Sequence, residues 1–246
     1  GTTGNDTENL AVYHSRFSIS AVPLTVPTVP AGLSATAGDG QVELSWTAPT
    51  DNGGSAITDY VVEVYGDGSW STFSDGTSTT TSATVTGLTN GTEYTFRVSA
   101  RNNLGDSSPS DSVAETPATT PGAPTELSAT SGDGQVGLSW TAPADNGGKT
   151  ITGYTVEKNC ADSGWSQATT TSGATSATVT SLTNGVSCDF RVSATNSVGT
   201  GDPSGTDTVT PAAVPGEPTG LSATSGDGQV ELSWTAPADN GSSITD

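Results

Sequence analysis

A string of 17 residues occurs three times with small changes, and this repeat constrains the fold more than any other feature of the sequence. The copies occupy residues 37–53, 131–147 and 225–241, and each contains GDGQV and then LSWTAP. The tryptophan in each copy lies 94 residues after the one before it. Solenoid repeats are about 20–50 residues long, so this longer period predicts a row of independent domains instead.

Each repeat has the composition and the alternation of a β-sheet protein. Only 31% of the residues are hydrophobic, whereas Gly, Ser, Thr, Asp and Pro are abundant, which favours short strands joined by tight turns. Alternation in residues 41–46 places Val42, Leu44 and Trp46 on one face of a strand. Further strands are expected at residues 32–38, 57–65, 82–88 and 93–100 and near Val113. About seven short strands in about 90 residues predict an all-β, two-sheet sandwich.

Several motifs in this pattern resemble a fibronectin type III domain. They are the inward tryptophan of the second strand, DNGGSAITDY at residues 51–60 and LTNGTEYTFRVSA at residues 88–100. Leu88, Gly91 and Tyr94 match the tyrosine corner of that family, which implies that the Tyr94 hydroxyl bonds back to nearby backbone. The resemblance implies tandem seven-stranded immunoglobulin-like sandwiches, in the style of bacterial secreted proteins and phage structural proteins.

The repeat divides the chain into four expected parts. Residues 27–117 and 118–211 form the first and second units, and residues 1–26 form an N-terminal segment outside the repeat. Residues 212–246 hold the truncated start of a third unit, with two strands and the beginning of another. One third of a sandwich buries too little apolar surface to offset its ordering entropy, so we expect the natural chain to continue beyond Asp246.

The second unit departs from the first at the tyrosine corner, where Cys188 replaces Tyr94. Cys160 follows the third strand of that unit, and Cys188 opens the strand expected to pair beside it. Antiparallel pairing would bring the two together, so we expect a disulfide that contributes about 3 kcal/mol to stability. The alternative is two unpaired thiols, with Cys188 packed as a small apolar side chain.

Charge and motifs exclude several classes of function. The chain carries 26 acidic and six basic residues, a net charge of −20, which disfavours nucleic acids and anionic lipid surfaces as partners. It has no run of 18 apolar residues, so we expect no membrane insertion. The single histidine, His14, has no neighbouring ligand or nucleophile. We therefore expect no enzymatic activity, no metal and no cofactor.

Two tryptophans in loops are candidates for ligand contact. Trp70 and Trp165 lie in comparable loops, GDGSWSTF and DSGWSQA. Aromatic side chains at the edge of a sandwich can stack on sugar rings or contact a receptor. They can equally cover the sheet edge and bury part of their own area, and we favour this second interpretation.

The N-terminal segment carries the functional hypothesis. Its alternation puts Tyr13, Phe17 and Ile19 on one face, and an isolated strand with an apolar face is an edge that seeks a partner. The segment could be the last strand of a preceding domain, a disordered leader, or a strand that docks on a protein partner. We favour docking on a partner in a larger extracellular assembly.

Three functions fit these observations. The favoured one is a non-enzymatic stalk or decoration displayed on a virion or cell surface and anchored by its N-terminal segment. The second is an adhesion module that binds carbohydrate or a host receptor. The third is a set of accessory domains of a secreted polysaccharide-degrading enzyme.

Overall fold

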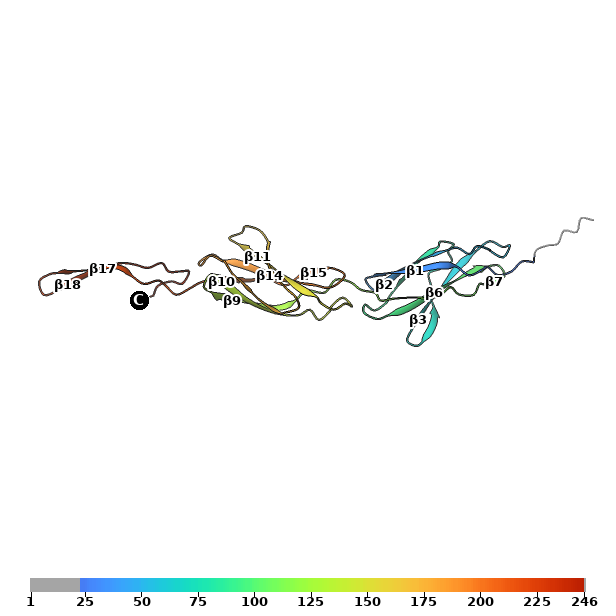
Figure 1. Ribbon diagram of the computed structural model, residues 1–246, viewed down its shortest axis with the longest axis horizontal. Coiled ribbons are helices and arrows are strands. Elements are labelled where there is room, and N and C mark those ends of the chain that lie inside the picture. The colour runs from blue at the N-terminus through green and yellow to red at the C-terminus, as the bar shows by residue number, and fades with distance from the viewer. Residues whose placement is uncertain (1–22, 246) are drawn as a thin grey trace, which may run out of the picture.

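The computed structural model describes residues 23–245, and within them the regular elements are all strands. The repeats form separate units that lie end to end in an extended row (Figure 1). Within residues 23–245, no helix is long and apolar enough to cross a membrane.

The first unit is a sandwich of a three-stranded sheet and a five-stranded sheet. The strand order is β1-β2-β5 in one sheet and β4-β3-β6-β7 in the other, where β8 also pairs with β6. The bounds are β1 (Ala31–Gly38), β2 (Gln41–Thr47), β3 (Asp59–Gly66), β4 (Ser69–Thr72), β5 (Ser82–Thr86), β6 (Tyr94–Asn102), β7 (Gly105–Asp106) and β8 (Val113–Glu115).

The second unit repeats this topology and confirms the predicted fold class. Its sheets have the orders β13-β10-β9 and β12-β11-β14-β15, and β16 also pairs with β14. The bounds are β9 (Thr125–Gly132), β10 (Gln135–Thr141), β11 (Gly153–Cys160), β12 (Ser166–Thr171), β13 (Ser176–Val179), β14 (Cys188–Thr195), β15 (Thr200–Pro203) and β16 (Asp207–Val209).

Each unit has eight strand segments rather than seven, because the last strand of the sandwich is interrupted. In the first unit β7 and β8 both pair with β6, and the residues between them keep part of the ladder. Ser110 N–H donates to Val98 O at 2.9 Å, and Val98 N–H donates to the Ser110 hydroxyl at 3.1 Å. Pro109 lies in this stretch and has no N–H to give, so the strand continues irregularly across it.

The core of each unit lies between its two sheets, as the alternation predicted. Trp46 and Trp140 are only 7% and 6% exposed. Each indole packs edge-on against a tyrosine of the facing sheet, Tyr60 or Tyr154, with ring centroids 5.3 and 5.4 Å apart. Nine of the ten buried residues in each core have a buried equivalent in the other, and the exceptions are Val64, which corresponds to Lys158, and Cys188, which corresponds to Tyr94.

In the described part of the third unit, a single hairpin stands without a second sheet. It consists of β17 (Thr219–Ser225) and β18 (Val230–Thr235). Leu232 and Trp234 occupy the positions of buried core residues, but here they are 55% and 58% exposed. The pattern therefore forms the hairpin, but these side chains are buried only where a facing sheet covers them.

In the linker between the first two units, the chain passes from one unit to the other at Ala118 and Thr119, and the backbone N–H of each of these residues is hydrogen-bonded. Ala118 N–H donates to Gly38 O of the first unit at 3.0 Å, and the next residue, Thr119, donates to Gly147 O of the second unit at 2.8 Å. Consecutive residues are therefore bonded to different units. The second linker repeats the pattern. Ala212 N–H donates to Gly132 O of the second unit, and Ala213 N–H donates to Asn240 O of the third.

A contact between glycines closes the same joint. Gly91 N–H donates to Pro117 O at 2.9 Å, and the backbone of Gly91 lies against Gly148. A Cβ atom on Gly148 would lie 2.8 Å from the carbonyl carbon of Asn90 and would overlap Gly91, and its φ of 80° also favours glycine. At the second joint, Gly241 approaches Gly185 in a similar way.

The segment before the first unit makes the contacts of such a linker. Thr25 N–H donates to Gly53 O at 3.0 Å, and the Asn102 side-chain amide donates to Thr25 O at 2.8 Å. Val26 lies beside Gly105. Residues 25 and 26, assigned above to the N-terminal segment, therefore pack on the first unit, because the linker pattern begins before residue 27.

Candidate functional site

An open hollow of about 600 Å³ lies on the outer face of the five-stranded sheet of the first unit. Alternation along β3 and β6 turns one set of side chains into the core and the other set toward this face. The charged residues that line the hollow come from β3, the 73–76 loop, β6 and β7, namely Asp59, Glu63, Asp75, Arg97, Arg101 and Asp106.

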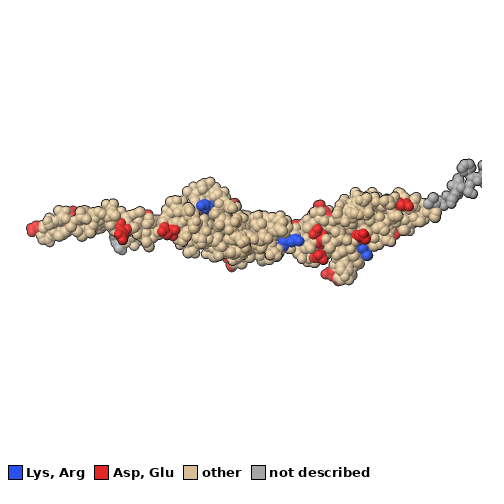
Figure 2. All heavy atoms as spheres, viewed as in Figure 1, with Lys and Arg blue, Asp and Glu red and all other residues tan. Residues whose placement is uncertain are grey.

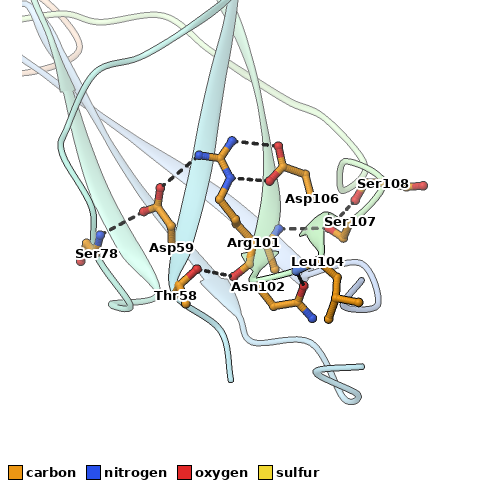
Figure 3. Close-up of polar contacts among 10 residues, drawn as sticks. Thr58, Asp59, Ser78, Arg101, Asn102, Leu104, Asp106, Ser107 and Ser108 are labelled. Carbon is orange, nitrogen blue, oxygen red and sulfur yellow. Dashed lines mark hydrogen bonds and ion pairs between the residues drawn. The ribbon is translucent and has the colours of Figure 1, made fainter. Parts of the chain in front are cut away.

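Arg101 is the centre of an ion-pair network at one end of the hollow (Figure 3). The strand register places it opposite Asp59 on β3 and opposite Asp106 on β7. Its Nε and Nη2 donate to the two carboxylate oxygens of Asp106 at 2.5 and 2.9 Å, and its Nη1 lies 3.8 Å from Asp59 Oδ2. Asp59 also accepts a hydrogen bond from Ser78 N–H at 3.0 Å.

The network lowers the pKa of Asp106 but contributes little to the stability of the unit. The hydrogen bonds from Arg101 lower the pKa of the Asp106 carboxyl below its ordinary value, against a smaller opposing effect of burial. The Arg101 and Asp106 side chains are 46% and 42% exposed, and ion pairs in such positions contribute little to folding. The network is therefore a polar surface rather than a structural brace.

A second ion pair lies further along the same face. Arg97 donates through Nε and Nη2 to the Glu63 carboxylate at 2.8 and 3.1 Å. The guanidinium carbon of Arg97 lies 4.0 Å from the ring centre of Trp70, and Trp70 packs against Tyr65 on the neighbouring strand, with centroids 5.4 Å apart. The indole thus covers a cation, an arrangement that is weakly stabilising at exposed sites.

Comparison with known families decides the identity of the repeat. The family model described as "Fibronectin type III domain" matches residues 28–116 and 122–210. The chain belongs to the fibronectin type III family. These matches cover both complete sandwiches, and domains of this family are non-catalytic modules.

Two curated relatives of the fibronectin type III repeats are bacterial enzymes. Chitinase A1 of Niallia circulans is 36% identical over 74% of this chain and 25% of its own length. Exoglucanase B of Cellulomonas fimi is 33% identical over 89% of this chain and 20% of its own length. The chain therefore spans only a quarter or a fifth of these relatives. A crystal structure of the chicken CNTN1 FN1–FN3 domains covers 86% of this chain and 76% of its own, with 24% identity and a TM-score of 0.41.

The two fibronectin type III units close their tyrosine-corner region differently. In the first unit, Thr89 N–H donates to the Tyr94 hydroxyl at 3.2 Å. In the second unit, Cys188 and Cys160 lie opposite one another on β14 and β11, with Cα atoms 4.1 Å apart, and form a disulfide. The second unit thus has a covalent tie between two strands where the first has a hydrogen bond.

Trp165 in the second unit repeats the stacking of Trp70. Its ring centre lies 4.2 Å from the guanidinium carbon of Arg191, which pairs with Glu157 at 2.8 Å. Neither tryptophan lines the hollow of the first unit. One ring face of each tryptophan lies on an arginine of β6 or β14.

The remaining predicted site residues lie elsewhere. Tyr13, Phe17 and Ile19, together with His14, lie outside the described residues. Within residues 23–245, no group of three or more His, Cys, Asp or Glu is placed to hold a metal ion. Acidic side chains are spread along all the units on the visible face, and basic ones are few (Figure 2).

Sequence reasoning missed the Arg101 network, although the repeat contains a signal for it. Aligning the units at their 94-residue offset puts Thr195 in place of Arg101, Gly153 in place of Asp59 and Thr200 in place of Asp106. The three partners of one network differ together. Such a joint difference between similar copies indicates side chains that the fold itself does not require.

Proposed function

We propose that this chain is a non-catalytic spacer segment of a larger extracellular protein, which holds neighbouring parts at a fixed distance and orientation. The observation that carries the proposal is the crossover at Ala118 and Thr119, where adjacent residues bond to different units. A flexible tether would need unbonded residues there. The row of units in Figure 1 agrees with this role.

An accessory role in a polysaccharide-degrading enzyme is the context that the relatives favour. Chitinase A1 and exoglucanase B each share with this chain a segment that is a minor part of their length. A spacer of this type would set the reach between a catalytic domain and its surface or substrate. The Cys160–Cys188 disulfide and the high acidity suit an oxidising exterior.

Replacing Gly148 with Ala should loosen the joint between the two units. The new Cβ would overlap the backbone of Gly91, so the contact must open while each sandwich stays folded. Spin labels on the two units should give a narrow distance distribution in the wild-type protein and a broad or shifted one in G148A, measured by pulsed electron resonance.

The matched control for this experiment is Gly54→Ala. Gly54 has the equivalent position and nearly the same φ, 77°, but a Cβ there would meet only the flexible end of Leu24. The variant therefore carries the same backbone strain without the clash between units, and its distance distribution should match the wild type. An unchanged distribution in G148A would contradict the rigid spacer.

We propose separately that residues 1–22 attach the chain to a larger assembly on a virion or cell surface, with Tyr13, Phe17 and Ile19 as the contact face. The contacts of Thr25 with Gly53 and Asn102 support this, because they hold Thr25, three residues after this segment, at the end of the first unit. Deleting residues 1–22 should abolish attachment while leaving the melting temperatures of both sandwiches unchanged. Full attachment of the truncated protein would reject the anchor but not the spacer.

A further inference from the structure

The hollow on the first unit is a feature of that unit rather than of the repeat. Its network residues Asp59, Arg101 and Asp106 have small uncharged counterparts in the second unit. The counterparts of Arg101 and Asp106, Thr195 and Thr200, share a single contact between hydroxyls at 3.0 Å. Both units fold with the same topology and nearly equivalent cores. The charged residues of the network in the first unit therefore serve something other than folding.

The edge strand explains why the first unit has room for this hollow. In the second unit β12 pairs with β11 as far as Thr171, whose carbonyl oxygen would lie 2.5 Å from a Cβ on Gly153. In the first unit β4 ends at Thr72, and residues 73–77 form a loop before Ser78 bonds to Tyr60 and Asp59. This loop forms one wall of the hollow. Asp59 has room for its side chain there, whereas Thr171 O would block a side chain at the equivalent Gly153 in the second unit.

The charges in the hollow select the class of ligand. Glu63 and Asp106 are each paired with an arginine through two hydrogen bonds, and Asp59 lies 3.8 Å from Arg101 Nη1. The fourth carboxylate of the hollow, Asp75, belongs to no group of three or more ligands among residues 23–245 that could hold a metal ion. A net charge of −20 on the chain opposes polyanions. What remains is a surface of fixed acceptors and donors, and sugar hydroxyls can both donate to carboxylates and accept from guanidinium groups.

An aromatic surface continues from the polar one. Arg97 lines the hollow and also lies under Trp70, and the Tyr65 ring packed beside Trp70 is 40% exposed. A pyranose ring has apolar C–H faces and a rim of hydroxyls, which match an aromatic ring beside charged hydrogen-bonding groups. The two surfaces lie along one sheet face, as a linear chain of sugars requires.

We propose that this face of the first unit binds a neutral polysaccharide chain. The Arg101–Asp106 and Arg97–Glu63 pairs hydrogen-bond the sugar hydroxyls, and Tyr65 and Trp70 contact an adjoining sugar. The second unit, which lacks the Arg101 network, does not bind. A spacer needs no ligand, so this activity goes beyond the proposed function, and either one can fail without the other.

The test is an NMR titration of the full chain with two neutral probes, cellohexaose and chitohexaose. At least one should shift the backbone amides around Arg97 and Arg101, and the shifts should saturate. Arg101→Thr, and the triple variant D59G/R101T/D106T, carry the residues of the second unit. Each should raise the dissociation constant at least tenfold, while the first unit keeps its dispersed amide spectrum. Arg101 is half exposed, so its single variant is expected to fold.

Trp165→Ala on the second unit is the matched control and should leave the dissociation constant unchanged, whereas Trp70→Ala should raise it. The proposal is overturned if neither neutral probe binds, if Arg101→Thr binds as tightly as the wild type, or if the shifts map equally to both units. Tighter binding of polygalacturonate than of either neutral probe would overturn the assigned ligand class.

Discussion

Replacing Trp46 with Ala should lower the stability of the first unit by about 3–5 kcal/mol, the usual cost of truncating a buried tryptophan. The indole is 7% exposed and packs on Tyr60, so its removal leaves a cavity between the two sheets. The stability of a domain is only about 5–15 kcal/mol. Calorimetry should show the transition of the first unit shifted down by about 12 °C or more, or lost.

The third unit supplies a control for this substitution within the same molecule. Trp234 occupies the equivalent strand position but is 58% exposed, so W234A removes an indole without opening a core. It should leave the transitions of both sandwiches within about 0.5 kcal/mol of the wild type. If W46A and W234A had equal effects, the assignment of Trp46 to the core would be wrong.

Removing the disulfide should destabilise the second unit by about 3–4 kcal/mol, because a cross-link between residues 28 apart lowers the conformational entropy of the unfolded chain. The double variant C160S/C188S should therefore unfold at a lower denaturant concentration. The first unit contains no cysteine, and its transition should not move. A shift of less than 1 kcal/mol in the second unit would contradict the expected contribution.

The first unit suggests a variant that replaces the covalent tie with the tyrosine corner. Its equivalent pair is Gly66 and Tyr94, and a Cβ on Gly66 would lie 3.3 Å from the Tyr94 ring. A side chain opposite the tyrosine would crowd its ring, so the matching variant is C160G/C188Y. It should recover about 1 kcal/mol over C160S/C188S, the net contribution of one hydrogen bond. Equal stability of the two variants would show that the corner bond does not transfer.

The sequence by itself determined the period, the fold class and the inward face of the strand at residues 41–46. Val42, Leu44 and Trp46 alternate with polar residues, and alternation depends only on neighbours along the chain. The facing positions of Cys160 and Cys188 also followed from the sequence, because adjacent antiparallel strands bring the end of one to the start of the next.

Only the tertiary structure decided the Arg101 network and the joint between the units, because both depend on strand register or on contacts between units. Asp59 faces Arg101 across two strands, and a shift of register by two residues would keep the alternation but separate the pair. The hydrogen bond of Ser78 to Asp59 and the contact of Gly91 with Gly148 likewise join segments far apart in the chain. A local pattern carries no information about such distances. The hollow, which supports the proposal of polysaccharide binding, and the joint between units, which supports the spacer, therefore became visible only in the folded chain.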